Sequence, residues 1–125
     1  MEADVTDPVA NRPTGEVLHG GARRLPVRVH NPYAADVVRI SRYVVDPGDR
    51  CSLHVHTGKT EAWLIVQGQG EARVGDVVLA VVAGDVVVTP PGRAHDLRNT
   101  GALPLVFANV VLPTGDAPIT TTELA

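Results

Sequence analysis

The stretch PGDRCSLHVHTGKTEAWLIVQG, residues 47–68, decides the fold of this chain. Alternate side chains of a β-strand point to the same face, so His54 and His56 share a face of one predicted strand. Glu61 opens the next predicted strand, which folds back beside the first after a turn. Two imidazoles and a carboxylate therefore converge. This is a metal-ligand set that lacks one member, and we expect His95 to supply it.

Composition limits the fold class and the partners. The chain has 125 residues, enough for one domain with a core, and valine is its most abundant residue, which favours strands over helices. The net charge is −3 without a basic cluster, which argues against a nucleic-acid partner. No apolar run has membrane-spanning length, so no membrane partner is expected.

The N-terminus and the cysteine content indicate the compartment. The first residues lack the basic-then-apolar pattern of a secretory signal. The single cysteine, Cys51, excludes an internal disulfide and fits a reducing environment. We therefore expect a cytoplasmic protein.

Short strands with turn residues between them predict an all-β sandwich or barrel of about eight to ten strands. The expected strands cover residues 25–30, 35–45, 51–56, 61–66, 71–74, 77–82, 86–89, 95–99 and 103–112. Residues 1–24 are polar and rich in proline and glycine, which predicts a mostly irregular N-terminal arm. Residues 25–113 form the predicted barrel, and residues 114–125 a loosely tethered C-terminal tail.

Two spaced motifs carry a family resemblance. The first consists of Gly48, His54, His56, Glu61 and Gly68. The second consists of Gly84, Pro90, Gly92, His95 and Asn99. At these spacings both motifs resemble the two signatures of the cupin superfamily, in particular the small bacterial single-domain members. The resemblance implies a double-stranded β-helix, also called a cupin or jelly-roll barrel.

The resemblance also implies that His54, His56, Glu61 and His95 bind one metal ion. Three imidazoles and one carboxylate suit Fe, Mn, Zn, Ni, Co or Cu better than Ca or Mg. Four protein ligands around an octahedral ion leave two positions for water, substrate or dioxygen. The alternative is that the histidines are ordinary polar residues on an exposed strand face.

Other residues are candidates for the cavity. Trp63 and Ile65 share the face of Glu61, which places them in or beside a pocket. Further candidates on flanking strands, whose facing the sequence leaves open, are Tyr43, Arg42, Phe107 and Asn109. Cys51 has the wrong alternation to join His54 as a ligand and is expected to be buried. Lys59 and His19 are expected to be solvated.

These observations give two hypotheses of function. The first is a metal-dependent cupin enzyme acting on a small organic metabolite, as in secondary metabolism, with Glu61 as the catalytic residue. No proton-transfer residue besides the ligands is evident, so Glu61 or metal-bound water acts as the base, or the chemistry is oxidative. Dioxygenase-type oxidation is placed slightly ahead of cyclisation or isomerisation. The alternative is a non-catalytic small-molecule-binding or sensor cupin. The resemblance further implies a homodimer, in which the arm could exchange between subunits.

Overall fold

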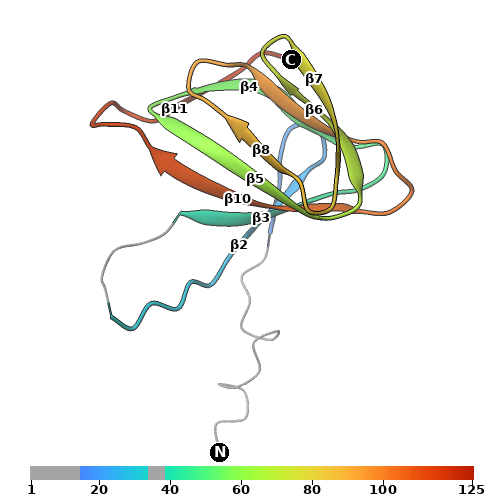
Figure 1. Cartoon of the computed structure of the whole chain (residues 1–125), viewed down its shortest axis with the longest axis horizontal. Helices are drawn as coiled ribbons and strands as arrows, with labels where there is room; N and C mark the ends of the chain where they lie inside the picture. Colours follow the sequence, from blue (N-terminus) through green and yellow to red (C-terminus); the bar gives the residue numbers. More distant parts are fainter. Residues whose placement is uncertain (1–14, 34–38) are drawn as a thin grey trace, which may run out of the picture.

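The computed structural model describes residues 15–33 and 39–125, which form two antiparallel sheets with no helix in these ranges (Figure 1). The strands are β1 (Glu16–Val17), β2 (Arg23–Pro26), β3 (Ile40–Val45), β4 (Arg50–Thr57), β5 (Lys59–Gln67), β6 (Gln69–Val74), β7 (Val77–Val82), β8 (Val86–Thr89), β9 (His95–Asn99), β10 (Leu105–Pro113) and β11 (Thr120–Glu123). One sheet has the order β1-β2-β3-β10-β5-β8, and the other β11-β4-β9-β6-β7. The predicted all-β class is confirmed.

The terminal segments differ from the prediction. The expectation of a loosely tethered tail is wrong at β11, which pairs with β4 at the edge of the five-stranded sheet. The expected arm includes β1, which pairs with β2. Residues 1–14 of the arm and residues 34–38 of the expected strand 35–45 lie outside the described residues.

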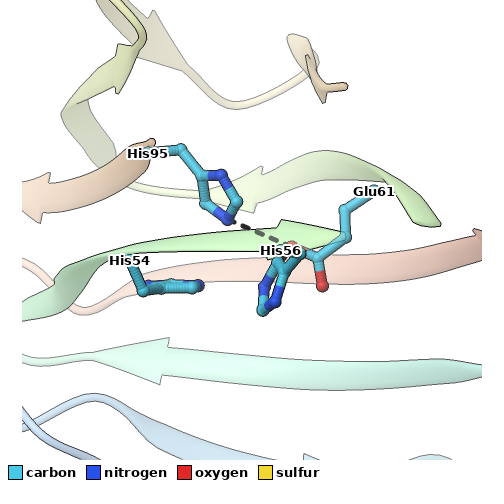
Figure 2. Close-up of side chains that lie close together, drawn as sticks. All are labelled: His54, His56, Glu61 and His95. Carbon is cyan, nitrogen blue, oxygen red and sulfur yellow. Dashed lines mark ion pairs between the residues drawn. The ribbon is translucent and has the colours of Figure 1, made fainter. Parts of the chain in front are cut away.

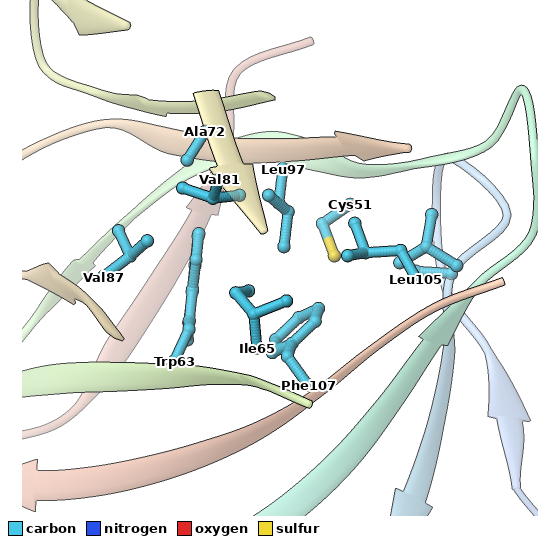
Figure 3. Close-up of a cluster of buried hydrophobic side chains, with 11 residues drawn as sticks. Cys51, Trp63, Ile65, Ala72, Val81, Val87, Leu97, Leu105 and Phe107 are labelled. Atoms are coloured by element: carbon cyan, nitrogen blue, oxygen red, sulfur yellow. The ribbon is translucent and has the colours of Figure 1, made fainter. Parts of the chain in front are cut away.

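The core lies between the two sheets, where alternate side chains of facing strands meet (Figure 3). Its buried apolar members are Ala22, Val45, Cys51, Trp63, Ile65, Ala72, Val81, Val87, Leu97, Leu105 and Phe107. Phe107 stacks almost parallel on Tyr43, with the ring centroids 4.9 Å apart. This aromatic pair continues the core toward the site described below.

A β-bulge in β4 sets the direction of the histidines. Cys51 pairs with Leu97 of β9, and His54 pairs with His95, so β4 contains one residue more than β9 between these pairs. The extra residue lets Cys51 and His54 both face the interior although they are three apart. The reasoning from strict alternation was therefore wrong for Cys51, which is buried as expected but faces inward like His54.

The turn between β4 and β5 depends on a glycine. Gly58 has a φ of +77°, and a Cβ atom there would lie 2.5 Å from the carbonyl oxygen of Pro118. The segment that leads into β11 thus passes directly over this turn. β11 then places Thr121 opposite His56 and Glu123 opposite His54.

Among the described residues, no helix is long and apolar enough to cross a membrane. The predicted cytoplasmic location stays a prediction.

Candidate metal centre

Three strands bring the four predicted ligands together inside the sandwich (Figure 2). His54 and His56 come from β4, Glu61 from β5 and His95 from β9. One ligand atom from each residue lies within 4.8 Å of those of the other three. Glu61, His56 and His95 are buried, while His54 is partly exposed. The alternative of imidazoles on an exposed strand face is therefore wrong.

Hydrogen bonds orient two imidazoles for metal binding. His54 Nδ1 donates to the carbonyl oxygen of Ser52 at 2.6 Å, and His95 Nδ1 donates to that of Arg93 at 2.9 Å. Because a carbonyl oxygen only accepts, both Nδ1 atoms carry the proton and both Nε2 atoms present a lone pair. Metal-binding histidines are commonly fixed in this way.

His56 is held by the C-terminal strand. Its Nδ1 atom lies 2.8 Å from the hydroxyl oxygen of Thr121 in β11. Its Nε2 atom lies 3.4 Å from Oε1 of Glu61. The ring is therefore fixed from one side by β11 and faces the carboxylate on the other.

His95 shows directly that these residues fit a metal ion. Its Nε2 atom is buried and has no hydrogen-bond partner among the described residues, because Oε1 of Glu61 is 3.5 Å away. A buried lone pair without a partner is unfavourable unless something fills the space it faces. A metal ion bound between Glu61 and the three imidazoles would accept that lone pair.

The Glu61 carboxylate is ionised. Burial alone would raise its pKa, but the neighbouring imidazoles of His56 and His95, the hydrogen bond from Asn109 and the charge of Lys59 hold the pKa well below its usual range. Asn109 Nδ2 donates to Oε2 at 2.9 Å, and Lys59 Nζ lies 3.1 Å from the same atom. The prediction that Lys59 is solvated is wrong, because its side chain is only 13% exposed.

His54 is neutral at pH 7. Burial lowers its pKa, and this effect outweighs the opposing hydrogen bond to Ser52. The neighbouring imidazoles of His95 and His56 lower the pKa further. A neutral ring with a free Nε2 lone pair is the form that binds a transition metal.

A cavity of about 200 Å³ adjoins the four ligands. Its lining shows which of the other predicted site residues reach it. Tyr43, Trp63, Phe107 and Asn109 line it. Ile65 belongs to the core and is not part of the wall. Arg42 is exposed, because it lies between two inward-facing residues of β3. The expectation that Ile65 and Arg42 reach the cavity is wrong.

The sequence interpretation missed several cavity residues, which lie on the terminal segments, at the start of β4 and at the start of β5. They are Leu18, His19, Arg24, Cys51, Ser52, Lys59, Thr121 and Glu123. His19 is exposed, as expected, but lies at the edge of the cavity. Lys59 and Ser52 carried a signal in the sequence, since each stands two residues before a predicted ligand, Glu61 or His54, and so shares its face.

A family model described as the cupin domain matches residues 41–111, more than half of the chain. The crystal structure of a predicted oxalate decarboxylase from Thermotoga maritima is similar, with a TM-score of 0.70 and 26% identity. The similarity covers 81% of this chain and 93% of that one. A cupin 2 conserved barrel domain protein from Rhodopseudomonas palustris gives a TM-score of 0.64 with 28% identity, over 80% of this chain and 66% of that one.

Curated relatives match 72 residues, or 58% of this chain. The oxalate-binding protein of Thermotoga maritima is 33% identical over 60% of its own length. The xanthan biosynthesis protein XanB of Xanthomonas campestris pv. campestris is 36% identical, and mannose-1-phosphate guanylyltransferase 2 of Escherichia coli O157:H7 is 31% identical. The chain spans only 15% of the length of each of these two proteins. With both signatures, the jelly-roll barrel and the family match in place, the chain belongs to the cupin family.

Proposed function

We propose that this cupin is a metal-dependent enzyme that acts on a small organic metabolite, as in secondary metabolism. The observation that carries the proposal is the unpartnered Nε2 lone pair of buried His95, which faces Glu61 beside a cavity. Four protein ligands leave coordination positions for a substrate on an ion that prefers six. A purely structural ion would need no adjoining cavity.

A divalent transition metal would supply either redox chemistry with dioxygen or Lewis-acid polarisation of a substrate oxygen. The protein would supply the aromatic rings of Tyr43, Trp63 and Phe107 beside polar side chains of the cavity wall, a combination that suits a planar substrate carrying polar groups. Oxygen-dependent oxidation stays slightly ahead of the other reaction types. Three imidazoles and a carboxylate suit redox-active Fe, Mn and Cu as well as Zn, so the identity of the metal separates oxidation from Lewis-acid chemistry.

Isomerisation or cyclisation is the second reaction type. The expectation that the site lacks a proton-transfer residue besides the ligands is wrong, since Tyr43 and Glu123 line the cavity. Burial raises the pKa of Tyr43, although the nearby Arg24 partly opposes this, so the phenol is protonated at pH 7 and can donate. Glu123 offers a carboxylate that could accept a proton.

Elemental analysis of protein purified without added metal, combined with the variant Glu61→Gln, tests the enzyme proposal. Iron or copper would favour oxidation, and zinc would favour Lewis-acid chemistry. We expect Glu61→Gln to lose turnover, while Glu71→Gln, in an exposed ion pair with Arg98, keeps it. Turnover that survives in metal-free Glu61→Gln protein would contradict the proposal.

A second candidate function is non-catalytic binding of a small molecule. The relative named as an oxalate-binding protein, at 33% identity, favours this reading and offers oxalate as a probe. Calorimetry on metal-loaded protein would detect binding, and mass analysis after incubation would detect conversion. Oxalate that binds but is recovered unchanged would favour the binding function, and conversion would favour the enzyme.

We also propose that the protein forms a homodimer through the outer face of the six-stranded sheet. On this face Leu64, Val66, Val86, Val88 and Leu112 are 42–59% exposed. Monomeric proteins rarely expose so continuous an apolar surface. Sedimentation should show a dimer that Leu64→Asp dissociates, and a monomeric parent protein would contradict the proposal. Exchange of the arm between subunits stays a prediction.

A further inference from the structure

Lys59, the only lysine of the chain, has an unusual environment. It begins β5, and its side chain is 13% exposed. Lysine is rarely so buried unless its ammonium group is paired. Here Nζ lies 3.1 Å from Oε2 of Glu61, which is itself 5% exposed. The cupin signatures do not include this position.

The two oxygens of Glu61 have different neighbours. Oε2 is contacted by two donors, Lys59 Nζ and Asn109 Nδ2, from β5 and β10. Oε1 faces the Nε2 atoms of His56 and His95, at 3.4 and 3.5 Å. The carboxylate is therefore held with one oxygen toward the protein wall and the other toward the imidazoles.

We propose that Lys59 is a positioning residue that, together with Asn109, restricts Glu61 to binding the metal ion through Oε1 alone. A carboxylate can otherwise bind through both oxygens. A second bound oxygen would occupy a position that an exogenous ligand could take. Lys59 thus keeps one coordination position of a bound metal ion free for a ligand from the cavity. The inference rests on the proposed metal site but not on any turnover.

A simpler role for Lys59 would be to compensate the buried charge of Glu61 without affecting its geometry. The two roles differ once a metal is bound. Charge compensation alone leaves the coordination of a probe ion unchanged when Lys59 is replaced, whereas a positioning role changes it. Cobalt(II) serves as the probe ion, because its visible spectrum reports coordination number, and azide serves as the small exogenous ligand.

The test compares Lys59→Met with Arg98→Met, which removes a cation from the exposed ion pair with Glu71. In the cobalt-loaded proteins we expect Lys59→Met to change the visible spectrum, which loss of charge compensation alone would not do, and to weaken azide binding. Arg98→Met should match the parent protein in both measurements. Lys59→Met with the parent spectrum and azide affinity would overturn the proposal.

Two further variants cover the case in which Lys59→Met folds but takes up no cobalt. Lys59→Arg keeps the cation and should restore the parent spectrum. Lys59→Gln keeps a donor without the charge, and a parent-like spectrum would support positioning through the contact with Oε2. If neither Lys59→Arg nor Lys59→Gln gives the parent spectrum, the proposal is overturned. Cobalt uptake by the parent protein without any turnover would refute the enzyme function and leave this inference intact. A parent protein that takes up no cobalt would refute both.

Discussion

The floor and the mouth of the cavity are built from different parts of the sheets. We call Cys51, Glu61, Trp63 and His95 the floor; they are buried, and each lies on a strand with neighbours on both sides. We call Arg24, Thr121 and Glu123 the mouth; they lie on β2 and β11, which are short and exposed. The floor therefore fixes the ligand atoms, while the mouth can vary at little cost to the fold. We expect the consequences of mutation to follow this division.

The largest effect is expected on the floor, at His95. Replacing it by glutamine removes the Nε2 lone pair that faces Glu61, so metal affinity should fall by more than about 100-fold, beyond the loss typical of an outer partner. Equilibrium dialysis with cobalt(II) measures the affinity, and far-UV circular dichroism checks the fold. Tight stoichiometric binding by folded His95→Gln protein would show that the floor is not the metal centre.

Cys51 should show how well the floor excludes solvent. Burial raises its pKa from 9.0 to about 12, with smaller contributions from the charges of Glu61 and Asp96. The raised pKa disfavours the thiolate, so at pH 8 its fraction falls about 1000-fold relative to an unshifted thiol. Iodoacetamide should label the native protein at least that much more slowly than protein unfolded in urea. Similar rates would mean that the floor opens to solvent.

At the mouth, Thr121→Val should have a smaller effect. The substitution removes the hydroxyl group that holds Nδ1 of His56, so we expect metal affinity to fall about tenfold, at the low end for an outer partner. Thr122→Val is the matched control, since Thr122 lies on the same strand opposite Val55. Equal effects of both variants on cobalt binding would point to disturbance of β11 rather than to the hydrogen bond.

The smallest effect is expected for Ser52→Ala. Its hydroxyl group donates to Oε2 of Glu123 at 2.5 Å, which joins β4 to β11. Ser52 is buried and Glu123 is exposed, so losing this hydrogen bond should lower the free energy of unfolding by about 0.5–1.5 kcal/mol, as measured in urea. Metal affinity should not change, because His54 uses the backbone carbonyl group of Ser52 and not its side chain. A large loss of metal affinity would mean that the hydrogen bond between Ser52 and Glu123 also positions a ligand.

The floor could largely be predicted from the sequence. The ligands stand at short, fixed spacings, and alternation along β5 correctly places Glu61 and Trp63 on one face. Alternation failed at Cys51, because the extra residue of the bulge in β4 depends on pairing with β9. Alternation also could not show whether Arg42 or Tyr43 points into the cavity, because the side of β3 that faces the interior depends on its register with β10.

The mouth could not be predicted. β11 consists of three threonines and a glutamate without apolar alternation, so its pairing with β4 leaves no periodic signal. The expectation of a solvated Lys59 fails because β5 begins two residues earlier than the predicted strand 61–66. The pairing of β11 with β4 joins residues that are distant in the sequence. The contact of Lys59 with Glu61 depends on where β5 begins.

Gly58 lies between β4 and β5, which carry the ligands, and next to the segment that leads into β11 at the mouth. A side chain at this position would collide with Pro118, whose segment continues into β11. Even alanine here should therefore lift the end of the chain off β4 and uncover the imidazoles of His54 and His56. One methyl group, added at a residue that does not line the cavity, should therefore open the cavity to solvent.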